Sequence, residues 1–334
     1  MQFSEFEIIE NIKMHLAPTT PNIIKGIGDD AAVVKKDEQH VSVISKDLLI
    51  ENIHFDLKHT SWLDLGKKAM AVNLSDIAAM AAKPTYALVA LGVPQKMTSA
   101  EISDLYTGLE YIAHEFSVSI VGGDLSRSPD KLFISITVVG EVTNSGCKYR
   151  EGAKEGDGIY VSGPLGSAAI GFSGLKKKKT IDHAYMQAFK NPRPRIFLGS
   201  LLAECSYVHA MIDTSDGLVQ DLEHIMTASK MQARLTLDDI PLEKDFHDTC
   251  KKLRLDPVET MLTGGEDYQL LFCMDDKKLP NLLKKLEMKR NIQIHRIGSV
   301  MKRNSDSETP TIQIFDSKQK EIKIKNKGFD HFKN

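Results

Sequence analysis

Six short clusters of carboxylates, each set among glycines or small polar residues, are spread along the chain. They are GIGDD (26–30), SKD (45–47), NLSD (73–76), VGGD (121–124), DTSDG (213–217) and GGED (264–267). Each follows or interrupts an apolar stretch, so we expect each where a strand or helix ends and a side chain can project into a cleft. Glycine beside an acid lets a ligand approach the backbone closely. Magnesium is usually held by one or two protein carboxylates together with water and substrate phosphate. The pattern therefore indicates a site for several magnesium ions and a polyphosphate.

A purely structural explanation exists for any single cluster. Asp beside Gly is common turn chemistry, and Asp or Ser before an apolar run is a common helix cap. For all six clusters together this explanation is weaker. SKD, NLSD and VGGD lie inside or at the end of strongly apolar segments, without the prolines and asparagines that usually accompany turn aspartates.

Bulk properties narrow the class of protein. The chain has 334 residues, of which 42% are hydrophobic and 26% charged, so it is long enough for two domains with substantial cores. A net charge of −2 gives no excess of positive charge that would indicate binding to nucleic acid or to a membrane surface. Glutamates near the N-terminus argue against a signal peptide, and no apolar run is long enough to span a membrane, so we expect a cytoplasmic protein. The four cysteines form no C-x-x-C pair, which predicts neither a zinc site nor a disulfide framework.

An α/β framework must position the clusters. Apolar alternation predicts strands at 31–34, 41–44, 86–93, 118–121, 132–142, 159–162, 208–212, 268–274 and 292–300. An opening helix is expected with Ile8, Ile9, Ile12 and Leu16 on its apolar side. Further helices are expected at 63–82, at 99–116 with Thr98 and Glu101 as a capping box, at 166–175, from an entry at Pro192 and Pro194 to about 204, at 218–228 with DTSDG as its cap, and at 277–286. The helix at 63–82 is apolar nearly all round and must be packed on most sides. A segment rich in Gly, Lys and Glu at 144–158 predicts a boundary between domains 1–145 and 146–334.

The familiar phosphoryl-transfer and hydrolytic machinery is absent from the sequence. There is no G-x-x-x-x-G-K-[ST], no H-R-D or D-F-G, and no G-x-S-x-G elbow, and GIGDD lacks the spacing of a dinucleotide-binding loop. What remains is an enzyme in which aspartates that are scattered along the chain bind the metal ions, and the metal ions bind the phosphates.

The motifs, taken in order, closely resemble the thiamine-monophosphate kinase family. They are GIGDDAAV, the 45–47 segment followed by NIHF, AVNLSDIAAM, IVGGD, REGAKEGD, IDTSDGL, TGGEDYQLLF and the terminal KGFDHF. That family belongs to a superfamily with aminoimidazole ribonucleotide synthetase, selenophosphate synthetase and a hydrogenase-maturation protein. The resemblance implies two α/β domains with an ATP and metal cleft between them, and a homodimer whose N-terminal strands form a β-barrel across the two-fold. It also implies the direct in-line transfer of a phosphoryl group from ATP to thiamine monophosphate, which gives thiamine diphosphate without a phosphoenzyme.

The resemblance also assigns residues. The magnesium positions are Asp30, Ser45, Asp47, Asp76, Asp124, Asp213 and Asp216. The ATP positions are Tyr106, Gly123, Asp124, Arg150 and Ser215. The positions that contact thiamine phosphate are His54, Glu266 and Phe329. On this assignment metal and ATP binding and dimerisation belong to the N-terminal domain, and the C-terminal domain adds nucleotide and substrate contacts.

These assignments agree in kind with the residues' own chemistry. Arg150 suits the neutralisation of a transferring phosphate, although a lone loop arginine is usually solvated. Phe329 could anchor the tail or stack on the thiazolium ring. His54 in an apolar stretch would otherwise be read as a core histidine, whereas the carboxylate of Glu266 can accept from a ring amine and Asp267 beside it can serve the backbone. No general base is required, because a phosphate monoester is already largely anionic near neutral pH.

Three positions depart from the family pattern: Lys46 and Leu125 each stand where threonine is usual, and Asn326 where tryptophan is frequent. In an extended segment Lys46 should face away from Ser45 and Asp47. The alternative is a bend that sends its ammonium to the phosphates in place of part of one magnesium's charge.

Two rival interpretations stay open at this stage. Another synthetase or dehydratase of the superfamily could share the metal cleft, although the chain lacks an N-terminal reactive cysteine and a C-terminal one. A non-catalytic nucleotide or cation sensor could also have kept the carboxylates.

Overall fold

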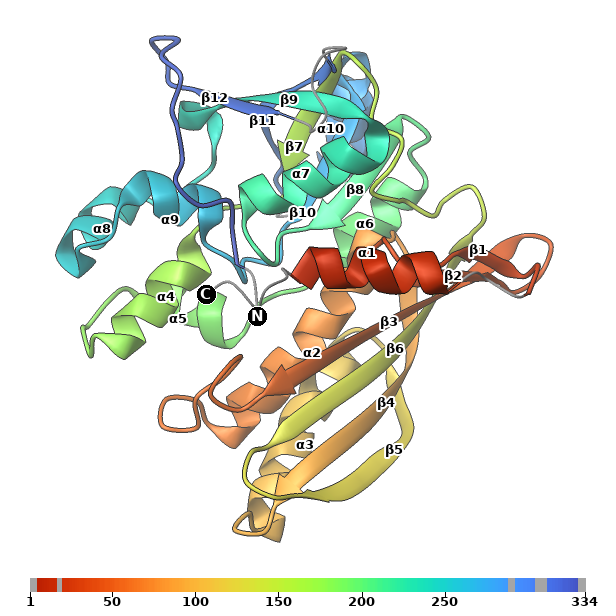
Figure 1. The fold of residues 1–334 in the computed structure, drawn as a ribbon, viewed down its shortest axis with the longest axis vertical. Helices are drawn as coiled ribbons and strands as arrows, with labels where there is room; N and C mark the ends of the chain where they lie inside the picture. The colour runs from red at the N-terminus through yellow and green to blue at the C-terminus, as the bar shows by residue number, and fades with distance from the viewer. Residues whose placement is uncertain (1–4, 17–19, 288–291, 304–310, 330–334) are drawn as a thin grey trace.

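The computed structural model describes residues 5–16, 20–287, 292–303 and 311–329. The described residues form two six-stranded sheets from consecutive parts of the chain, and helices pack around both (Figure 1). The strand order is β1-β2-β3-β6-β4-β5 in the first sheet and β12-β9-β11-β7-β10-β8 in the second. The fold is therefore α/β with two sheets, as expected.

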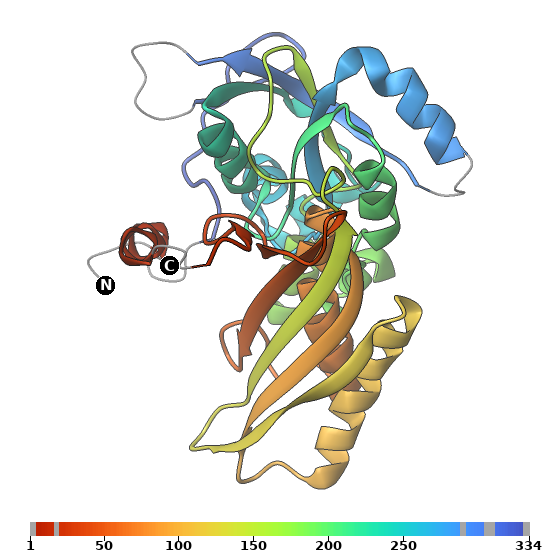
Figure 2. The ribbon, with the colours of Figure 1, turned by 90° about the vertical axis from the view of Figure 1, so that its right-hand side faces the viewer.

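The first sheet is antiparallel except where β4 runs parallel to β5. Its strands are β1 (Ile23–Lys25), β2 (Ala32–Lys35), β3 (His40–Ile50), β4 (Lys83–Pro94), β5 (Ser119–Ser128) and β6 (Phe133–Thr143). Helix α1 (Glu5–His15) precedes it, and α2 (Trp62–Ala79) and α3 (Ser99–Glu115) lie on one side of it, while no described helix covers the lower part of its other face (Figures 1 and 2). Thr98 and Glu101 form the predicted capping box of α3.

Helix α2 joins the two halves. Thirteen of its eighteen residues are buried, which confirms that it must be packed on most sides. It contacts β3, β4 and β6 of the first sheet and also β8 (Val208–Asp213) and α6 (Ile196–Ala203) of the second half. Any polar side chain near the middle of α2 is consequently held between the two sheets.

The second sheet is antiparallel except where β12 runs parallel to β9. Besides β8, its strands are β7 (Asp157–Val161), β9 (Met231–Thr236), β10 (Leu270–Asp275), β11 (His295–Lys302) and β12 (Ile312–Phe315). Besides α6, its helices are α4 (Ser167–Lys176), α5 (His183–Lys190), α7 (Leu218–Ser229), α8 (Phe246–Leu253), α9 (Pro257–Thr263) and α10 (Leu279–Glu287). Two single 3₁₀ turns occupy 237–239 and 276–278.

The two halves share hydrophobic core. One cluster of buried side chains runs from Val33 and Leu74 in the first half to Leu202 and Phe272 in the second. A second cluster, around Ile159 and Leu222, belongs to the C-terminal half. The predicted boundary after residue 145 falls between the two sheets and stays a prediction, as does the barrel across a dimer.

Several sequence expectations need correction. The strand predicted at 41–44 continues to Ile50, and the strand predicted at 118–121 continues to Ser128, so SKD and VGGD lie within strands and not at their ends. NLSD lies inside α2, whose carboxyl end is three residues further on. Gly217, the last residue of DTSDG, is the N-cap of α7 as predicted, but no side chain of the motif makes a capping hydrogen bond. The elements β1, α5, β9, α8, α9 and β12 were not predicted.

Among the described residues no helix is both long and apolar enough to cross a membrane.

Candidate active site

Three predicted metal ligands meet between the two sheets. Asp30 comes from the loop between β1 and β2, Asp76 from α2 and Asp213 from the end of β8, and one oxygen of each lies within 4.8 Å of the others. These residues are separated by up to 183 positions in the chain, so the fold, and not local sequence, assembles them. Hard carboxylate oxygens at this spacing are a donor set suited to magnesium.

Helix α2 fixes the ligands on both of its sides. The Ser45 hydroxyl on β3 donates to Asp76 Oδ2, and the backbone N–H of Asp47 donates to Asn73 Oδ1 at 3.1 Å. On the other side of the helix, Ser75 Oγ donates to Asp213 Oδ2 at 2.5 Å. The NLSD motif therefore connects β3 with β8.

Arg150 closes the cluster on the side of the GIGDD loop. Its Nε and Nη2 donate to Asp30 Oδ1 at 3.2 and 2.6 Å, and its backbone N–H donates to the Asp29 carboxylate. Lys25 Nζ lies 3.6 Å from Asp29 Oδ2. The other oxygen of Asp30, Oδ2, is buried and has no hydrogen-bond partner among the described residues. A buried acceptor without a donor is costly, and a bound cation would satisfy it.

The carboxylates occupy surroundings that oppose their ionisation. Burial raises the pKa of Asp47 to about 6, and burial together with Asp30 raises that of Asp213 to about 8. Burial and the neighbours Asp47, Asp213 and Asp30 hold the pKa of Asp76 well above its ordinary value. Such an arrangement favours binding of a cation, because a positive charge offsets both the cost of burying the carboxylates and the repulsion between them.

The GGED loop is docked on the DTSDG loop. Glu266 N–H donates to Ser215 O at 2.7 Å, and Tyr268 N–H donates to Thr214 O at 2.8 Å. A Cβ at Gly265 would lie 2.4 Å from Ser215 O, so only glycine allows this approach. Glu266 has φ +64°, in the left-handed region that non-glycine residues rarely adopt. The predicted substrate residue Glu266 and the predicted ATP residue Ser215 are thereby adjacent.

Asp267, next to Glu266, turns inward. Its carboxylate accepts from the backbone N–H of Gly166 at 2.6 Å and of Ala168 at 3.0 Å, at the amino end of α4. Burial raises the pKa of Asp267 to about 7. It serves the backbone, as the sequence suggested.

The C-terminal segment reaches the same loop. Phe329 N–H donates to Asp216 O at 3.2 Å, and Gln220 Nε2 donates both to Phe329 O at 2.8 Å and to Asp216 Oδ2 at 3.1 Å. The Phe329 ring is exposed. Phe329 and Asp216 therefore lie together beside the site, whereas the last three residues of KGFDHF are outside the described residues.

His54 lies in the turn after β3. Its Nδ1 accepts from the backbone N–H of Ile50 at 2.9 Å, so the proton of a neutral ring is carried on Nε2. The ring is half-buried, at the end of the strand that carries Ser45 and Asp47.

Three predicted residues stand apart from the cluster within one chain. Register puts Gly123 and Asp124 on β5, with β4 and β6 between them and β3, which is roughly 14 Å at about 4.8 Å per strand. Asp124 is exposed and accepts from Ser126 Oγ. Tyr106 lies half-buried on α3, which packs against β5. Tyr106, Gly123 and Asp124 thus collect at one edge of the first sheet, whereas Arg150 lies beside Asp30 and Ser215 beside Glu266.

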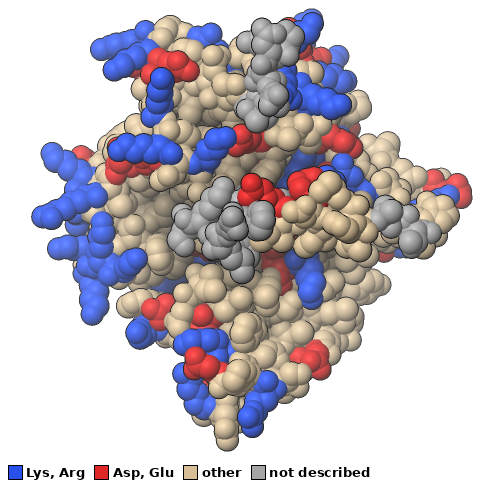
Figure 3. All heavy atoms as spheres, in the orientation of Figure 1, with Lys and Arg blue, Asp and Glu red and all other residues tan. Residues whose placement is uncertain are grey.

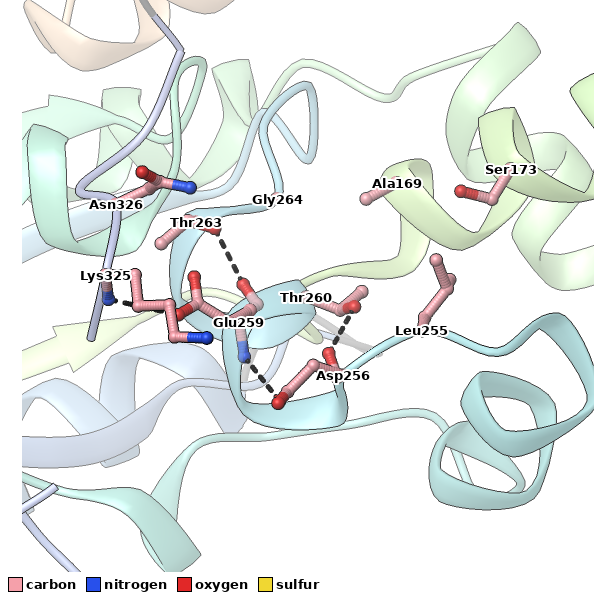
Figure 4. A pocket seen from close by; sticks show the side chains of 10 residues that line it. All are labelled: Ala169, Ser173, Leu255, Asp256, Glu259, Thr260, Thr263, Gly264, Lys325 and Asn326. Carbon is pink, nitrogen blue, oxygen red and sulfur yellow. Dashed lines mark hydrogen bonds between the residues drawn. The ribbon is translucent and has the colours of Figure 1, made fainter. Parts of the chain in front are cut away.

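None of the three departures from the family pattern replaces a carboxylate of the cluster. Lys46 is exposed and alternates with the buried Ser45 and half-buried Asp47, as expected for an extended strand. Leu125 is exposed on β5. Asn326 lines a cavity of about 470 Å³ between α4, α9 and the C-terminal segment (Figure 4).

That cavity borders the GGED loop at Gly264 but holds no carboxylate of the cluster. Several of its polar groups are already engaged. Asp256 caps α9 by accepting from Val258 N–H, and Glu259 Oε1 accepts from the backbone N–H of Lys325. The cavity adjoins the site without being its chemical centre.

Sequence reasoning missed several residues that hold the site. Asp221 is buried on α7 and accepts from the N–H groups of Asp216 and Gly217, and burial with the charge of Asp216 holds its pKa well above the ordinary value. Asn73 and Ser75 lie inside a motif that had been recognised, and Asp29 inside another. Their membership of these motifs could have marked them as functional, but their hydrogen-bond partners are remote in sequence and could not be predicted from it.

Family models match most of the chain. AIR synthase related protein, N-terminal domain, matches residues 28–142, and AIR synthase related protein, C-terminal domain, matches residues 154–309. A thiamine-monophosphate kinase of Buchnera aphidicola subsp. Schizaphis graminum is 35% identical, over 99% of this chain and 100% of that protein. The thiamine-monophosphate kinase of Bacillus subtilis is 32% identical, over 98% of this chain and 99% of that protein.

Solved structures give the same result. A structure described as AaThiL complexed with AMPPCP and TMP has a TM-score of 0.84 at 29% identity, covering 99% of both chains. Thiamine monophosphate kinase from Aquifex aeolicus has a TM-score of 0.77 at 27% identity, covering 96% of this chain and 99% of that one. A hydrogenase maturation protein, HypE, in complex with ATP shares the fold, with a TM-score of 0.70 at 20% identity. The sequence relatives and the shared architecture show that the chain belongs to the thiamine-monophosphate kinase family.

Proposed function

We propose that this protein transfers the γ-phosphoryl group of ATP to thiamine monophosphate and so forms ADP and thiamine diphosphate. The observation that carries the proposal is the buried meeting of Asp30, Asp76 and Asp213 beside Arg150, in a chain of this family. The neighbouring structure that holds AMPPCP, an ATP analogue, together with TMP supports both substrates.

Magnesium is the cofactor that fits the donor set. Asp30, Ser45, Asp47, Asp76, Asp213 and Asp216 would hold the ions, and the unpartnered Oδ2 of Asp30 supports this assignment. When bound, the ions supply positive charge that brings two polyanionic substrates together. The residues themselves contribute alignment, because Ser45 and Ser75 donate to Asp76 and Asp213, and Arg150 donates to Asp30.

Arg150 has the role of phosphate neutraliser. Its guanidinium is held by Asp30 at the edge of the cluster, so it meets the transferring group without reorganisation. The acceptor phosphate has a second pKa of about 6 and is largely ionised near neutral pH. A direct in-line attack therefore needs no general base from the protein.

The acceptor's organic part belongs on the GGED side. Glu266 has a partly exposed carboxylate suited to a ring amine, and Phe329 has an exposed ring suited to stacking on the thiazolium cation. His54 can donate from Nε2, because Nδ1 is engaged by the backbone.

A homodimer would complete the site. The face of the first sheet that no described helix covers exposes Ile44, Leu48, Tyr86 and Leu88, and this region is mostly uncharged in Figure 3. Beyond Ile44, β3 has no described partner on its β2 side, and β5 forms the other edge of the sheet. Pairing of β5 from one copy with β3 of another would close a barrel and bring Tyr106, Gly123 and Asp124 toward the second copy's cluster. We propose this dimer, in the cytoplasm.

The direct test is ATP consumption by the purified protein with magnesium and thiamine monophosphate, with thiamine as the control acceptor. We expect ADP and thiamine diphosphate in equal amounts, and no ADP with thiamine. ATP binding without turnover would favour the sensor interpretation. ATP hydrolysis indifferent to thiamine monophosphate would favour another member of the superfamily.

A further inference from the structure

A buried lysine lies behind the proposed acceptor site. Lys68 is on α2, two helical turns before Asp76, and its side chain is 3% exposed. Its Nζ lies 2.8 Å from Glu266 Oε1, and the Glu266 side chain is 33% exposed. The approach is close, yet its direction leaves Nζ without a proper hydrogen bond. Lys68 therefore acts on Glu266 mainly as a buried positive charge.

The rest of the lysine's surroundings is apolar or aromatic. Nζ lies 4.0 Å from the centre of the Phe189 ring, a cation–π contact that favours the charged ammonium. Glu266 is its only ion-pair partner among the described residues. A helix that needed only to pack would carry an apolar residue here, because burying an ion pair often costs more than it returns.

Glu266 needs such a partner. Burial and the charges of Glu266, Asp47, Asp213 and Asp216 hold the pKa of Tyr268 well above its ordinary value, so Glu266 lies near the same carboxylates. Its backbone is in the left-handed region and is held by the hydrogen bond to Ser215 O. Like charges nearby repel the carboxylate and favour its turning away. The Lys68 ammonium, 2.8 Å from Glu266 Oε1, opposes this reorientation.

We propose that Lys68 is a positioning residue for the acceptor, whose buried ammonium holds the Glu266 carboxylate in the orientation that binds the amino-bearing ring of thiamine monophosphate. This inference rests on the proposed function. It predicts that Lys68 affects the acceptor through Glu266 and leaves the ATP side unchanged.

A double-mutant cycle tests this coupling. The variants are Lys68→Met, Glu266→Gln and the two combined, and the measurements are calorimetric binding of thiamine monophosphate and steady-state kinetics for each substrate. We expect each single variant to weaken thiamine monophosphate binding and raise its KM roughly 10- to 100-fold, the range for losing a charged partner. The KM for ATP and kcat should stay within about twofold. The double variant should be no worse than Glu266→Gln alone.

Lys67→Met is the matched control. Lys67 is the neighbouring residue on α2, and its Nζ lies 4.4 Å from the Tyr111 ring on α3, away from Glu266. It should behave as the wild type. If Lys68→Met does not fold, Phe189→Leu replaces it in the same cycle, with a smaller effect in the same direction.

The outcomes separate the two claims. Additive effects of Lys68→Met and Glu266→Gln, an equal rise in the KM for ATP, or a Lys68→Met protein that matches Lys67→Met would overturn the inference and leave the proposed function standing. A wild-type protein that neither binds nor phosphorylates thiamine monophosphate would overturn both.

Discussion

Crowding of buried carboxylates is the main physical fact of the site at the scale of single residues. Asp47, Asp76 and Asp213 have raised pKa values, so the folded protein without metal holds protons that the unfolded chain releases. Fold stability, protonation and cation binding are consequently linked.

That linkage gives the first prediction. Each of these carboxyls binds its proton more tightly when folded, so without metal the free energy of unfolding should fall as pH rises from about 4 to about 8. Magnesium binds the ionised native form and should restore stability more at pH 8 than at pH 5. Melting temperatures measured with chelator and with magnesium at both values check this. A metal-free protein equally stable at pH 5 and pH 8 would contradict it.

Phe329→Ala should weaken thiamine monophosphate and spare ATP. The exposed ring is fixed through the backbone bonds to Asp216 and Gln220, so its removal deletes a stacking face without loosening the loop. Losing one such contact, on the order of 1 to 2 kcal/mol, corresponds to roughly ten- to thirtyfold in affinity. Separate titrations of the two substrates measure it. If only the affinity for ATP changed, the assignment of the C-terminal segment to the thiamine monophosphate side of the site would be wrong.

Lys46→Thr should leave the magnesium dependence of activity unchanged. Lys46 is exposed on β3 and alternates with Ser45 and Asp47, so its ammonium is directed away from the cluster. Activity titrated against magnesium in both proteins provides the comparison. A higher magnesium requirement in the variant would mean that Lys46 replaces part of the metal's charge.

At the scale of elements, α2 shows which features of the site could be predicted from the sequence and which could not. Its burial was predictable from its composition, and its NLSD motif marked it as functional. What sequence reasoning could not supply is that Asp76 faces β3 while Ser75 faces β8, because this depends on which strands pack on each side of the helix. For the same reason Lys68 remained one lysine among many, since its partner lies 198 positions away.

The contact between the GGED and DTSDG loops is the second element-scale feature. Gly265→Ala would place a methyl group 2.4 Å from Ser215 O, so the loops must separate. We expect a loss of stability of about 1 to 3 kcal/mol and weaker thiamine monophosphate binding. Gly26→Ala is the control, because nothing lies within 4 Å of its added Cβ. Unfolding in urea and substrate titration measure both effects, and two variants that behave alike would rule out the loop contact as the cause.

At the scale of the whole molecule, the predicted site residues lie in two separate places within one chain. The sequence yielded both α/β halves and most of their strands, and the motifs named Tyr106, Gly123 and Asp124 together with Asp76. Register then separates β5 from β3 by two strands. A list of motifs carries no information on whether its members meet within one chain or across two.

Subunit complementation distinguishes these cases. Asp76→Asn and Asp124→Asn should each abolish turnover and keep the wild-type circular dichroism, because each removes a charge that bound magnesium requires. If Asp124 serves the partner's cluster, a mixed dimer of the two variants has one site with both defects and one with neither. Random reassortment makes about half of the dimers mixed, so refolding an equal mixture should restore about a quarter of wild-type activity. Size-exclusion chromatography confirms the dimer, and each variant refolded alone is the control. If Asp124 serves its own chain, every site in the mixture carries one defect and activity stays absent.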